Sequence, residues 1–230
     1  MSFRTVGFLA LAAVAGCRDA PAPRAIAVNP IRDSIRTRSL ERFAERPDSV
    51  LARVDTGRIL GAPTARQWVV FVGELQCAKC ASALHELLPV LRREYVETGK
   101  IRFGFINAGA EDTVYNARFA AHAAFCAGLS GRFWEALDAI AAAHDEWVAL
   151  DDPQSRLDAI AVRAGADAEQ QRACRQRGRM LAMLAWDKER ADAAQLTAIP
   201  TLLIGDQRLT GDLSPAAVRR AIDKALAAKP

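Results

Sequence analysis

The feature that most constrains the fold is an apolar run that ends in a glycine and leads directly into a cysteine pair. Residues 67–73 read QWVVFVG, and Cys77-Ala-Lys-Cys80 follows four residues later. An apolar run without polar alternation predicts a strand that is buried on both faces. The leucines after the cysteine pair repeat at spacings of three and four: Leu84, Leu87, Leu88 and Leu91. This spacing predicts an amphipathic helix from Cys77 to about Glu97, with a kink at Pro89.

The rest of the chain extends this strand–helix unit into a mixed α/β plan. Residues 100–107 predict a second strand, and residues 200–205 predict a short third strand that a hairpin can extend. Ser214 and Pro215 are suited to the N-cap and the first position of a last helix. The segment between the second and third strands is wholly helical in pattern. We therefore predict an α/β fold with a mixed sheet and an all-helical subdomain inserted at about 109–195.

The start of the chain has the pattern of an export signal. A short positive start is followed by an apolar run over residues 6–15 and then by Val14-Ala-Gly-Cys17. The run is too short to span a bilayer, and it has the length of a signal-peptide core. Its last four residues resemble the lipobox of bacterial lipoproteins, which implies that Cys17 carries lipid. The alternative is a plain secretory signal in which Cys17 is incidental, and in both cases we expect the mature chain to leave the cytoplasm.

These observations divide the chain into three parts. We expect a lipoprotein signal peptide at 1–16, a tether and N-terminal surface segment at 17–54, and a folded domain at 55–228. The tether is indicated by the proline- and alanine-rich stretch after Cys17, and residues 33–54 suggest one or two short surface helices. The net charge of +4 is spread over the chain, and no basic run is interleaved with aromatic residues. This pattern excludes nucleic acid as an expected partner.

The cysteine pair is placed for thiol chemistry. At the N-terminus of a helix, unpaired N–H groups and the helix dipole favour the thiolate of Cys77. Cys80 lies one turn further along on the same face, close enough to form a disulfide with Cys77. Thiol–disulfide exchange needs this asymmetry, because one sulfur forms the mixed disulfide and the other resolves it. Lys79 adds positive charge that also favours the thiolate, unless it is simply a solvent-facing lysine.

Two other interpretations of the pair remain open at this point. Cys77 and Cys80 are half of a zinc site if a second pair of ligands exists, and His122 and Cys126 are four residues apart on one expected helix. The chain has no second Cys-x2-Cys, however, and zinc knuckles usually occupy tight turns. A purely structural disulfide between Cys77 and Cys80 is the other alternative. We predict no metal at this site.

Three segments together resemble the bacterial DsbA-like thioredoxin-fold proteins. They are FVGELQCAKCASALHELLPVLRREYVETGKIRF, AAFCAGLSGRFWEALDAI and TAIPTLLIGDQRLTGDLSPAAVRRAID. The resemblance covers roughly residues 55–228. It implies a thioredoxin-like mixed sheet with an inserted helical subdomain, Cys77 as the exposed nucleophile and Cys80 as its resolving partner. It also implies that Pro200 is a cis-proline facing the cysteines, followed by Thr201 at the start of a strand.

The chain departs from the family pattern in three places. Alanine and lysine stand between the cysteines where the family usually has Pro-His or Pro-Tyr, and this dipeptide tunes oxidising strength. Ile199 precedes the proline where threonine or valine is common, which bears on substrate contact. Phe71 stands where thioredoxin-like proteins often keep a buried acid. The nearest acid is Glu74, which is either a proton carrier for Cys80 or a solvated residue.

The remaining two cysteines lie in the helical block. A disulfide between Cys126 and Cys174 closes a loop of about 50 residues and stabilises the fold by about 2–4 kcal/mol. Some DsbA-like proteins carry a second bridge in this region. The alternative is a pair of buried free thiols. We expect His122 to be a core or helix-face histidine.

The sequence therefore predicts an extracytoplasmic, membrane-anchored thiol–disulfide oxidoreductase without a cofactor. Its substrates are expected to be cysteine-containing polypeptides, with dithiol oxidation as the favoured direction. The resemblance further implies a membrane partner that reduces quinone and restores the disulfide. Two alternatives remain: a reductase or isomerase, and a metal- or peptide-binding lipoprotein on a thioredoxin scaffold.

Overall fold

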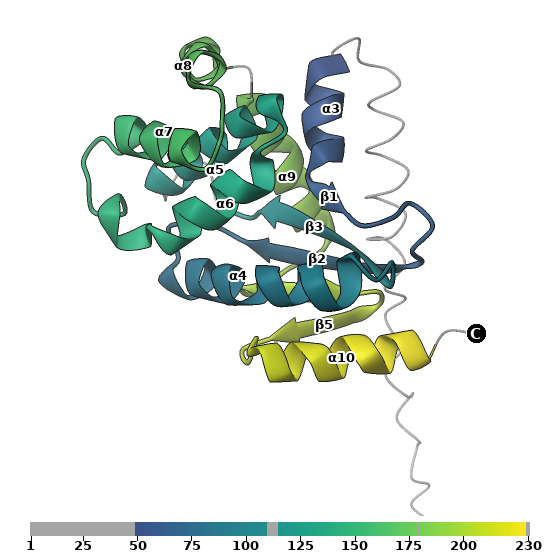
Figure 1. Cartoon of the computed structure of the whole chain (residues 1–230). Coiled ribbons are helices and arrows are strands. Elements are labelled where there is room, and N and C mark those ends of the chain that lie inside the picture. The colour runs from purple at the N-terminus through teal and green to yellow at the C-terminus, as the bar shows by residue number, and fades with distance from the viewer. Residues whose placement is uncertain (1–48, 110–114, 179, 229–230) are drawn as a thin grey trace, which may run out of the picture.

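The computed structural model describes residues 49–109, 115–178 and 180–228. The expectations for residues 1–48, including the signal peptide, Cys17 and the tether, lie outside these ranges. A five-stranded mixed sheet forms the centre, in the order β1-β3-β2-β4-β5 (Figure 1). The strands are β1 (Ile59–Leu60), β2 (Gln67–Gly73), β3 (Ile101–Asn107), β4 (Thr201–Ile204) and β5 (Gln207–Thr210). β2 and β3 are parallel, and the other neighbouring strands are antiparallel.

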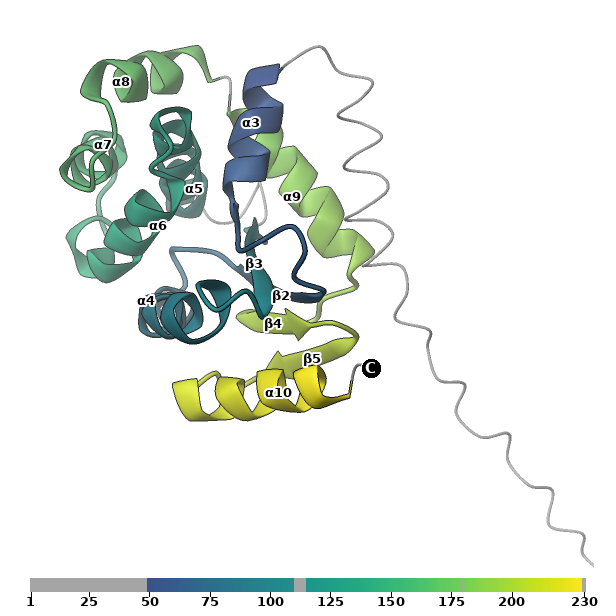
Figure 2. The ribbon, with the colours of Figure 1, turned by 45° about the vertical axis from the view of Figure 1, so that its right-hand side comes forward.

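The helices between β3 and β4 confirm the predicted inserted block. The α-helices of the described residues are α3 (Ser49–Gly57), α4 (Ala78–Leu91), α5 (Tyr115–Ala127), α6 (Phe133–Ala142), α7 (Gln154–Arg163), α8 (Ala168–Arg177), α9 (Leu181–Ala193) and α10 (Pro215–Ala227). In Figure 2, α5 to α8 gather as a group apart from β4, β5 and α10. None of the helices in the described part of the chain combines the length and the apolar character of a membrane-spanning helix.

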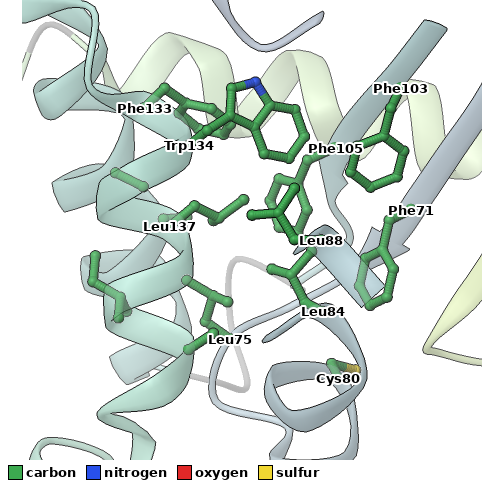
Figure 3. Close-up of a cluster of buried hydrophobic side chains, with 14 of the residues drawn as sticks. Phe71, Leu75, Cys80, Leu84, Leu88, Phe103, Phe105, Phe133, Trp134 and Leu137 are labelled. Atoms are coloured by element: carbon green, nitrogen blue, oxygen red, sulfur yellow. The ribbon is translucent and has the colours of Figure 1, made fainter. Parts of the chain in front are cut away.

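The two central strands are buried on both faces, as their apolar sequence predicts. On one face, Val69 and Phe71 of β2 belong to the main core with α4, α5, α6 and α10. On the other face, Val70 and Val72 pack in a smaller cluster with the end of α9. Figure 3 shows Cys80 of α4 at the margin of the main core, beside Leu84. The cysteine-bearing turn is therefore built directly onto the packed interior.

The irregular part of the long helix falls after Pro89 rather than at it. Pro89 lies inside α4, and the α-helical bonding continues to Leu91. A π-helical turn over Arg92–Val96 follows, and the N–H of Arg92 donates to the carbonyls of both Leu88 and Pro89. The irregularity that was predicted at Pro89 is thus a wider helical turn, which begins directly after the α-helix.

This π-helical turn anchors the far end of the helix to α10. Glu94 accepts two hydrogen bonds from the guanidinium of Arg219, at 2.6 and 2.8 Å. The hydroxyl of Tyr95 donates to Asp223 at 3.0 Å. Both partners lie on the last helix, so the C-terminal end of α4 is fixed in the fold by polar contacts.

The prediction of a surface segment up to residue 54 is wrong for its last residues. Val54 of α3 is only 1% exposed, and Leu51, three positions earlier, is also buried. Both belong to the main core, and a Cβ at Gly128 would approach Val54 to 2.8 Å. α3 is therefore an integral helix of the domain, because its apolar positions fall on one face.

A buried ionic cluster holds α3 against α9 and β3. Arg58 donates to the fully buried carboxylate of Asp187 at 2.7 and 3.0 Å, and it also binds Asp55. Arg190 binds both carboxylates, each at about 3 Å. The N–H of Asn107 at the end of β3 donates to Asp187 at 2.9 Å. The two arginines compensate the two carboxylates, so the cluster is neutral as well as hydrogen-bonded.

Candidate active site

The cysteine pair forms the first turn of α4. Cys77 is the N-cap residue, in an extended conformation, and its sulfur accepts a hydrogen bond from the N–H of Cys80 at 3.2 Å. Both residues are thiols, and their Sγ atoms are 2.6 Å apart. Cys77 is half-buried, whereas Cys80 is 1% exposed. The structure therefore brings the two predicted sulfurs together with one of them open to solvent and the other closed.

The environment of Cys80 keeps this residue protonated. Burial raises the pKa of the Cys80 thiol far above its ordinary value, and the hydrogen bond to Cys77 and the nearby carboxylate of Glu74 raise it further. The end of β2 lies against the same side chain. A Cβ added at Gly73 would lie 3.3 Å from Cβ and 3.4 Å from Sγ of Cys80. A side chain at position 73 would crowd the sulfur that must move during exchange.

The dipeptide between the cysteines faces solvent. Ala78 and Lys79 are both exposed. The ammonium group of Lys79 is therefore available to approaching molecules, and the structure matches the solvent-facing alternative for this residue.

The segment before β4 lies at the same end of the sheet as the cysteines. The Ile199–Pro200 peptide bond is cis. Thr201 pairs with Val72, so antiparallel register places Pro200 at the level of Gly73, the residue that adjoins Cys80. The hydroxyl of Thr201 donates to the carbonyl of Ala198 at 2.6 Å, which closes the turn around the proline.

The side chain in front of this proline is open to solvent. Ile199 is 37% exposed and is one of few large apolar side chains with this exposure in the described part of the chain. This side chain precedes the cis-proline that the strand register places at the level of Gly73.

Glu74 is buried, so the solvated alternative for this residue is wrong. Its exposed fraction is 6%, and its carboxylate accepts the N–H of Gln76 at 2.8 Å. Burial raises the pKa of Glu74, and hydrogen bonds from the main chain of Gln76 and Cys77 together with the charge of His144 oppose this rise. A carboxyl group with a raised pKa beside a buried thiol keeps its proton to a higher pH than an exposed glutamate does.

His144 of the insertion contacts the active-site loop, and the sequence analysis did not identify it. Its Nε2 lies 3.0 Å from the carbonyl oxygen of Gln76, and its Nδ1 lies 3.0 Å from Asp145. A carbonyl oxygen can only accept, so Nε2 carries a proton. Burial lowers the pKa of His144, but its hydrogen bonds to Gln76 and Asp145 outweigh burial and raise it. No local signal predicts this contact, because the two residues are 68 positions apart.

A second hydrogen bond ties the same loop to the insertion. The side-chain oxygen of Gln76 accepts the N–H of Ala117, in the first turn of α5. The residue immediately before Cys77 is therefore held by α5 through its side chain and by His144 through its main chain.

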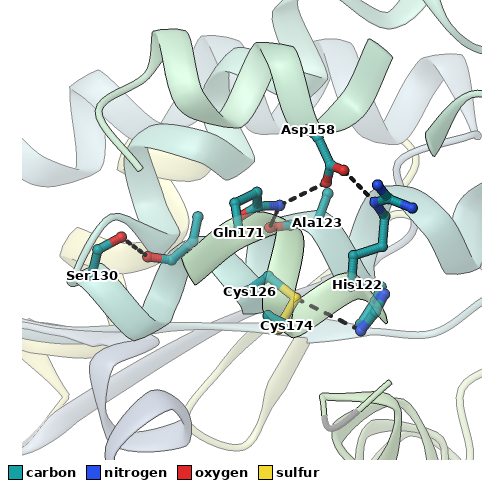
Figure 4. Close-up of a disulfide and its surroundings, with 9 residues drawn as sticks. His122, Ala123, Cys126, Ser130, Asp158, Gln171 and Cys174 are labelled. Carbon is teal, nitrogen blue, oxygen red and sulfur yellow. Dashed lines mark hydrogen bonds and ion pairs between the residues drawn. A yellow bond between two sulfur atoms is a disulfide. The ribbon is translucent and has the colours of Figure 1, made fainter. Parts of the chain in front are cut away.

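Cys126 and Cys174 form a disulfide with each other, so the alternative of two buried free thiols is wrong. The bridge joins α5 to α8 across 48 residues. Figure 4 shows the bridge with His122 beside it, where Nε2 lies 3.7 Å from Sγ of Cys126. His122 is 6% exposed, and burial lowers its pKa to about 4. Phe133 and Trp134 are core residues.

The alternative zinc site is not formed, because Cys77 and Cys80 do not lie together with His122 and Cys126. Within residues 49–109, 115–178 and 180–228, the group of potential ligands close enough to share an ion is His122, Cys126 and Cys174. Cys77 and Cys80 are not part of this group.

Comparisons with known proteins agree with this arrangement. A family model described as Thioredoxin matches residues 53–224. The search of curated proteins gave no match. BdbD from Bacillus subtilis, in its oxidised form, is similar in structure with a TM-score of 0.63 and 18% identity, over 75% of this chain and 94% of that one.

Two further solved structures give the same picture. α-DsbA1 from Wolbachia pipientis has a TM-score of 0.61 and 20% identity, over 74% of this chain and 90% of that one. MdbA, a thiol-disulfide oxidoreductase from Corynebacterium diphtheriae, has a TM-score of 0.57 and 18% identity, over 71% of this chain and 88% of that one. At these identities the likeness establishes the fold, a mixed sheet with an inserted helical block. Because the family model spans most of the sequence, the chain belongs to the thioredoxin family, and its fold is that of the DsbA-type proteins.

Proposed function

We propose that the chain is an extracytoplasmic protein thiol–disulfide oxidoreductase that oxidises dithiols in cysteine-containing polypeptides. The observation that carries this proposal is the asymmetry of the cysteine pair. Cys77 is accessible at a helix N-terminus, whereas Cys80 is buried and kept protonated. A pair of this kind lets one sulfur meet the substrate while the other completes or reverses the exchange.

The oxidised enzyme carries a Cys77–Cys80 disulfide at the start of the reaction. A substrate thiolate attacks Sγ of Cys77, the bond between the two cysteines breaks, and Cys80 leaves as a thiolate that takes up a proton. The second substrate thiolate then attacks its own sulfur in the mixed disulfide and releases Cys77. The substrate has lost two electrons and two protons, and the enzyme has gained them as two thiols.

Glu74 is the proposed proton donor to Cys80. Its burial keeps a proton on the carboxyl group at higher pH than for an exposed glutamate. Its charge also acts on the Cys80 thiol, so proton transfer to the leaving sulfur avoids two neighbouring negative charges. Glu74 takes this role because Phe71 stands where thioredoxin-like proteins often keep a buried acid.

The segment around the cis-proline is the proposed contact for substrate. Pro200 lies at the level of Gly73 beside the cysteines, and Ile199 presents an exposed apolar side chain. Thr201 fixes the turn through its bond to Ala198. An extended peptide lying along this segment would bring its cysteine to Cys77.

The location and the redox partner are also part of the proposal. The signal peptide at 1–16 and the lipobox-like Val14-Ala-Gly-Cys17 support a lipid anchor on Cys17, with a tether to the domain that begins near residue 49. A membrane protein that reduces quinone would reoxidise Cys77 and Cys80. In this arrangement the helical block at about 109–195 is an insertion in one catalytic domain.

The reduction potential of the Cys77–Cys80 pair tests the proposed direction. The full chain with Cys17→Ser is equilibrated against glutathione buffers, and the thiols are counted by alkylation and mass spectrometry. A potential near about −120 mV supports the dithiol oxidase, and one near about −270 mV indicates a reductase instead. If Cys77 and Cys80 form no disulfide at any potential, the proposed exchange chemistry is wrong.

A further inference from the structure

We propose that the disulfide-bonded pair in the insertion becomes a zinc site when it is reduced, with His122 as the third ligand. The cluster consists of His122, Cys126 and Cys174, all buried. It is separate from the proposed active site, because neither Cys77 nor Cys80 belongs to it. The inference does not depend on the proposed function.

The first observation is the position of the imidazole. His122 lies one helical turn before Cys126 on α5, and its Nε2 faces Sγ of Cys126 at 3.7 Å. Among the residues that the structure describes, this sulfur is the hydrogen-bonding atom that contacts the ring. A disulfide sulfur is a weak acceptor, so the bridge alone gives little reason to bury a polar ring there.

The second observation is that one ligand distance already suits a metal ion, while the two sulfurs, now bonded at 2.00 Å, separate on reduction. The three potential ligand atoms lie within 4.8 Å of one another. In a tetrahedral zinc site with Zn–S of about 2.3 Å and Zn–N of about 2.0 Å, sulfur and nitrogen ligands are about 3.5 Å apart. The observed 3.7 Å between Nε2 and Sγ is close to that edge.

The third observation is an acidic group in a small hollow beside His122. The hollow is lined by His122, Asp158 and Arg175 together with Phe119, Ala123 and Gln154, and it has room for about one water molecule. Asp158 is held in place by Arg175 and by the side-chain amide of Gln171. Figure 4 labels both Asp158 and His122, and both line this hollow. Metal-bound histidines usually direct their other ring nitrogen to a carboxylate, directly or through water, and a water molecule in the hollow would connect the ring to Asp158.

The chemistry is balanced in two steps. A dithiol reductant transfers two electrons and two protons to the bridge, so that Cys126 and Cys174 become thiols and the reductant becomes a disulfide. Zn²⁺ then binds the two sulfurs and Nε2 of His122, and the two thiol protons are released to solvent. The fourth position belongs to water. The ion would join α5 to α8 in place of the covalent bridge.

The experiment uses the full chain with Cys17→Ser, Cys77→Ser and Cys80→Ser, which leaves only the second pair. The protein is reduced with dithiothreitol, desalted without oxygen and titrated with Co²⁺, whose absorption reports thiolate ligands and tetrahedral geometry. Zn²⁺ is then added in competition with a chromogenic chelator. We expect one tightly bound ion per reduced chain and none per oxidised chain.

Two variants separate a built site from two thiols that bind metal unaided. His122→Ala should weaken zinc binding by about 100-fold or more, because a direct ligand is lost and the loss of a group that merely orients a ligand already costs about 10- to 100-fold. His122→Gln serves as a second variant of similar size. His85→Ala is the matched control, because His85 is exposed on α4 and lies outside the cluster. Its zinc affinity should equal that of the parent.

Three results would overturn the proposal. They are equal zinc affinity in His122→Ala and the parent, absence of one-to-one binding to the reduced chain, and loss of helical circular dichroism on reduction that zinc does not restore. The oxidised form of each variant, with the bridge intact, shows whether the substitution itself prevents folding. If His122→Ala fails to fold, the comparison is made with His122→Gln.

Discussion

The two cysteine pairs of this protein differ in almost every respect that governs sulfur chemistry. Cys77 and Cys80 are three residues apart at the start of one helix, and one of them is open to solvent. Cys126 and Cys174 are 48 residues apart, both buried, and joined between two helices. Opening the first pair releases no long loop, whereas opening the second frees a large part of the insertion. The same functional group can therefore serve exchange in one place and cross-linking in another, according to its position in the fold.

The largest expected difference is in activity. Cys77→Ser should lower dithiol oxidation on the order of a thousandfold, because the disulfide that the substrate thiolate attacks can no longer form. The double variant Cys126→Ser and Cys174→Ser should stay within about tenfold of the parent, since the bridge lies outside the proposed site. Oxidation of a two-cysteine model peptide, followed by mass spectrometry, measures both rates. A comparable loss of oxidation rate in the folded double variant would contradict this difference between the two cysteine pairs.

The second difference is in stability. Loss of the Cys126–Cys174 bridge should lower the free energy of unfolding by about 2–4 kcal/mol, because the unfolded chain gains freedom over a long loop. Reduction of the Cys77–Cys80 disulfide opens a much shorter loop and should lower the free energy of unfolding less. Urea unfolding of the metal-free double variant, with Cys77→Ser as the control, gives the two midpoints. Equal midpoints would show that the insertion does not depend on its bridge.

The third difference is between the two sulfurs of the Cys77 and Cys80 pair. Iodoacetamide should alkylate Cys77 about a hundred times faster than Cys80 at pH 8, because Cys80 is buried and its raised pKa keeps it as a thiol. The rate at Cys80 should continue to rise with pH up to the most alkaline condition at which the protein stays folded. Peptide mapping after timed alkylation resolves the two sites. Similar rates at both would remove the asymmetry on which the proposed function rests.

A smaller effect is expected at Glu74. Glu74→Gln should slow dithiol oxidation about tenfold at pH 7, within the range seen for the loss of a proton donor. The raised pKa means that the ionised carboxylate is disfavoured in the folded state, so it costs stability above its folded pKa and not below pH 4.5. Glu74→Gln should therefore gain stability relative to the parent at pH 7 but not at pH 4. Glu86→Gln, an exposed change on the same helix, is the control for both measurements.

The smallest effect is expected at His144, which connects the insertion to the loop before Cys77. The raised pKa means that its protonated form stabilises the fold, fully below pH 6.5 and progressively less as pH rises through the folded value. His144→Gln should remove this pH dependence and cost about 0.5–1.5 kcal/mol at pH 6. Thermal unfolding at pH 6 and pH 8, with His85→Gln as the matched exposed control, measures it. An unchanged pH dependence would mean that the contact with Gln76 carries no weight.

Local pattern was enough to predict the elements that carry the cysteines. The apolar run of β2 and the leucine spacing of α4 are each written in fewer than twenty residues, and Ser214 caps α10 as expected. The contacts around the pair depend on distant parts of the chain. The register of Val72 with Thr201 and the bond from His144 to Gln76 join segments that no short pattern relates.

Burial was the other property that the sequence left open. Glu74 is a single acidic residue after an apolar strand, and nothing nearby distinguishes a buried carboxylate from a solvated one. Its burial follows from packing around the loop: a Cβ at Gly109 would lie 3.4 Å from that of Glu74. The burial of α3 was missed for a similar reason, because Arg58 and Asp55 read as surface charges until Asp187 and Arg190 are placed beside them.

The π-helical turn at Arg92–Val96 has a mechanical consequence for the helix that carries the cysteines. Through Glu94 and Tyr95, the turn fastens the last residues of this helix to α10, while its first turn ends at an N-cap open to solvent. The helix is therefore held at both ends, since Gln76, the residue before Cys77, is bound to α5 and to His144. When the sulfurs join or separate, the displacement falls on the cysteine-bearing turn between these two anchored ends. The anchors can then keep α10 and the rest of the domain unchanged in both redox states.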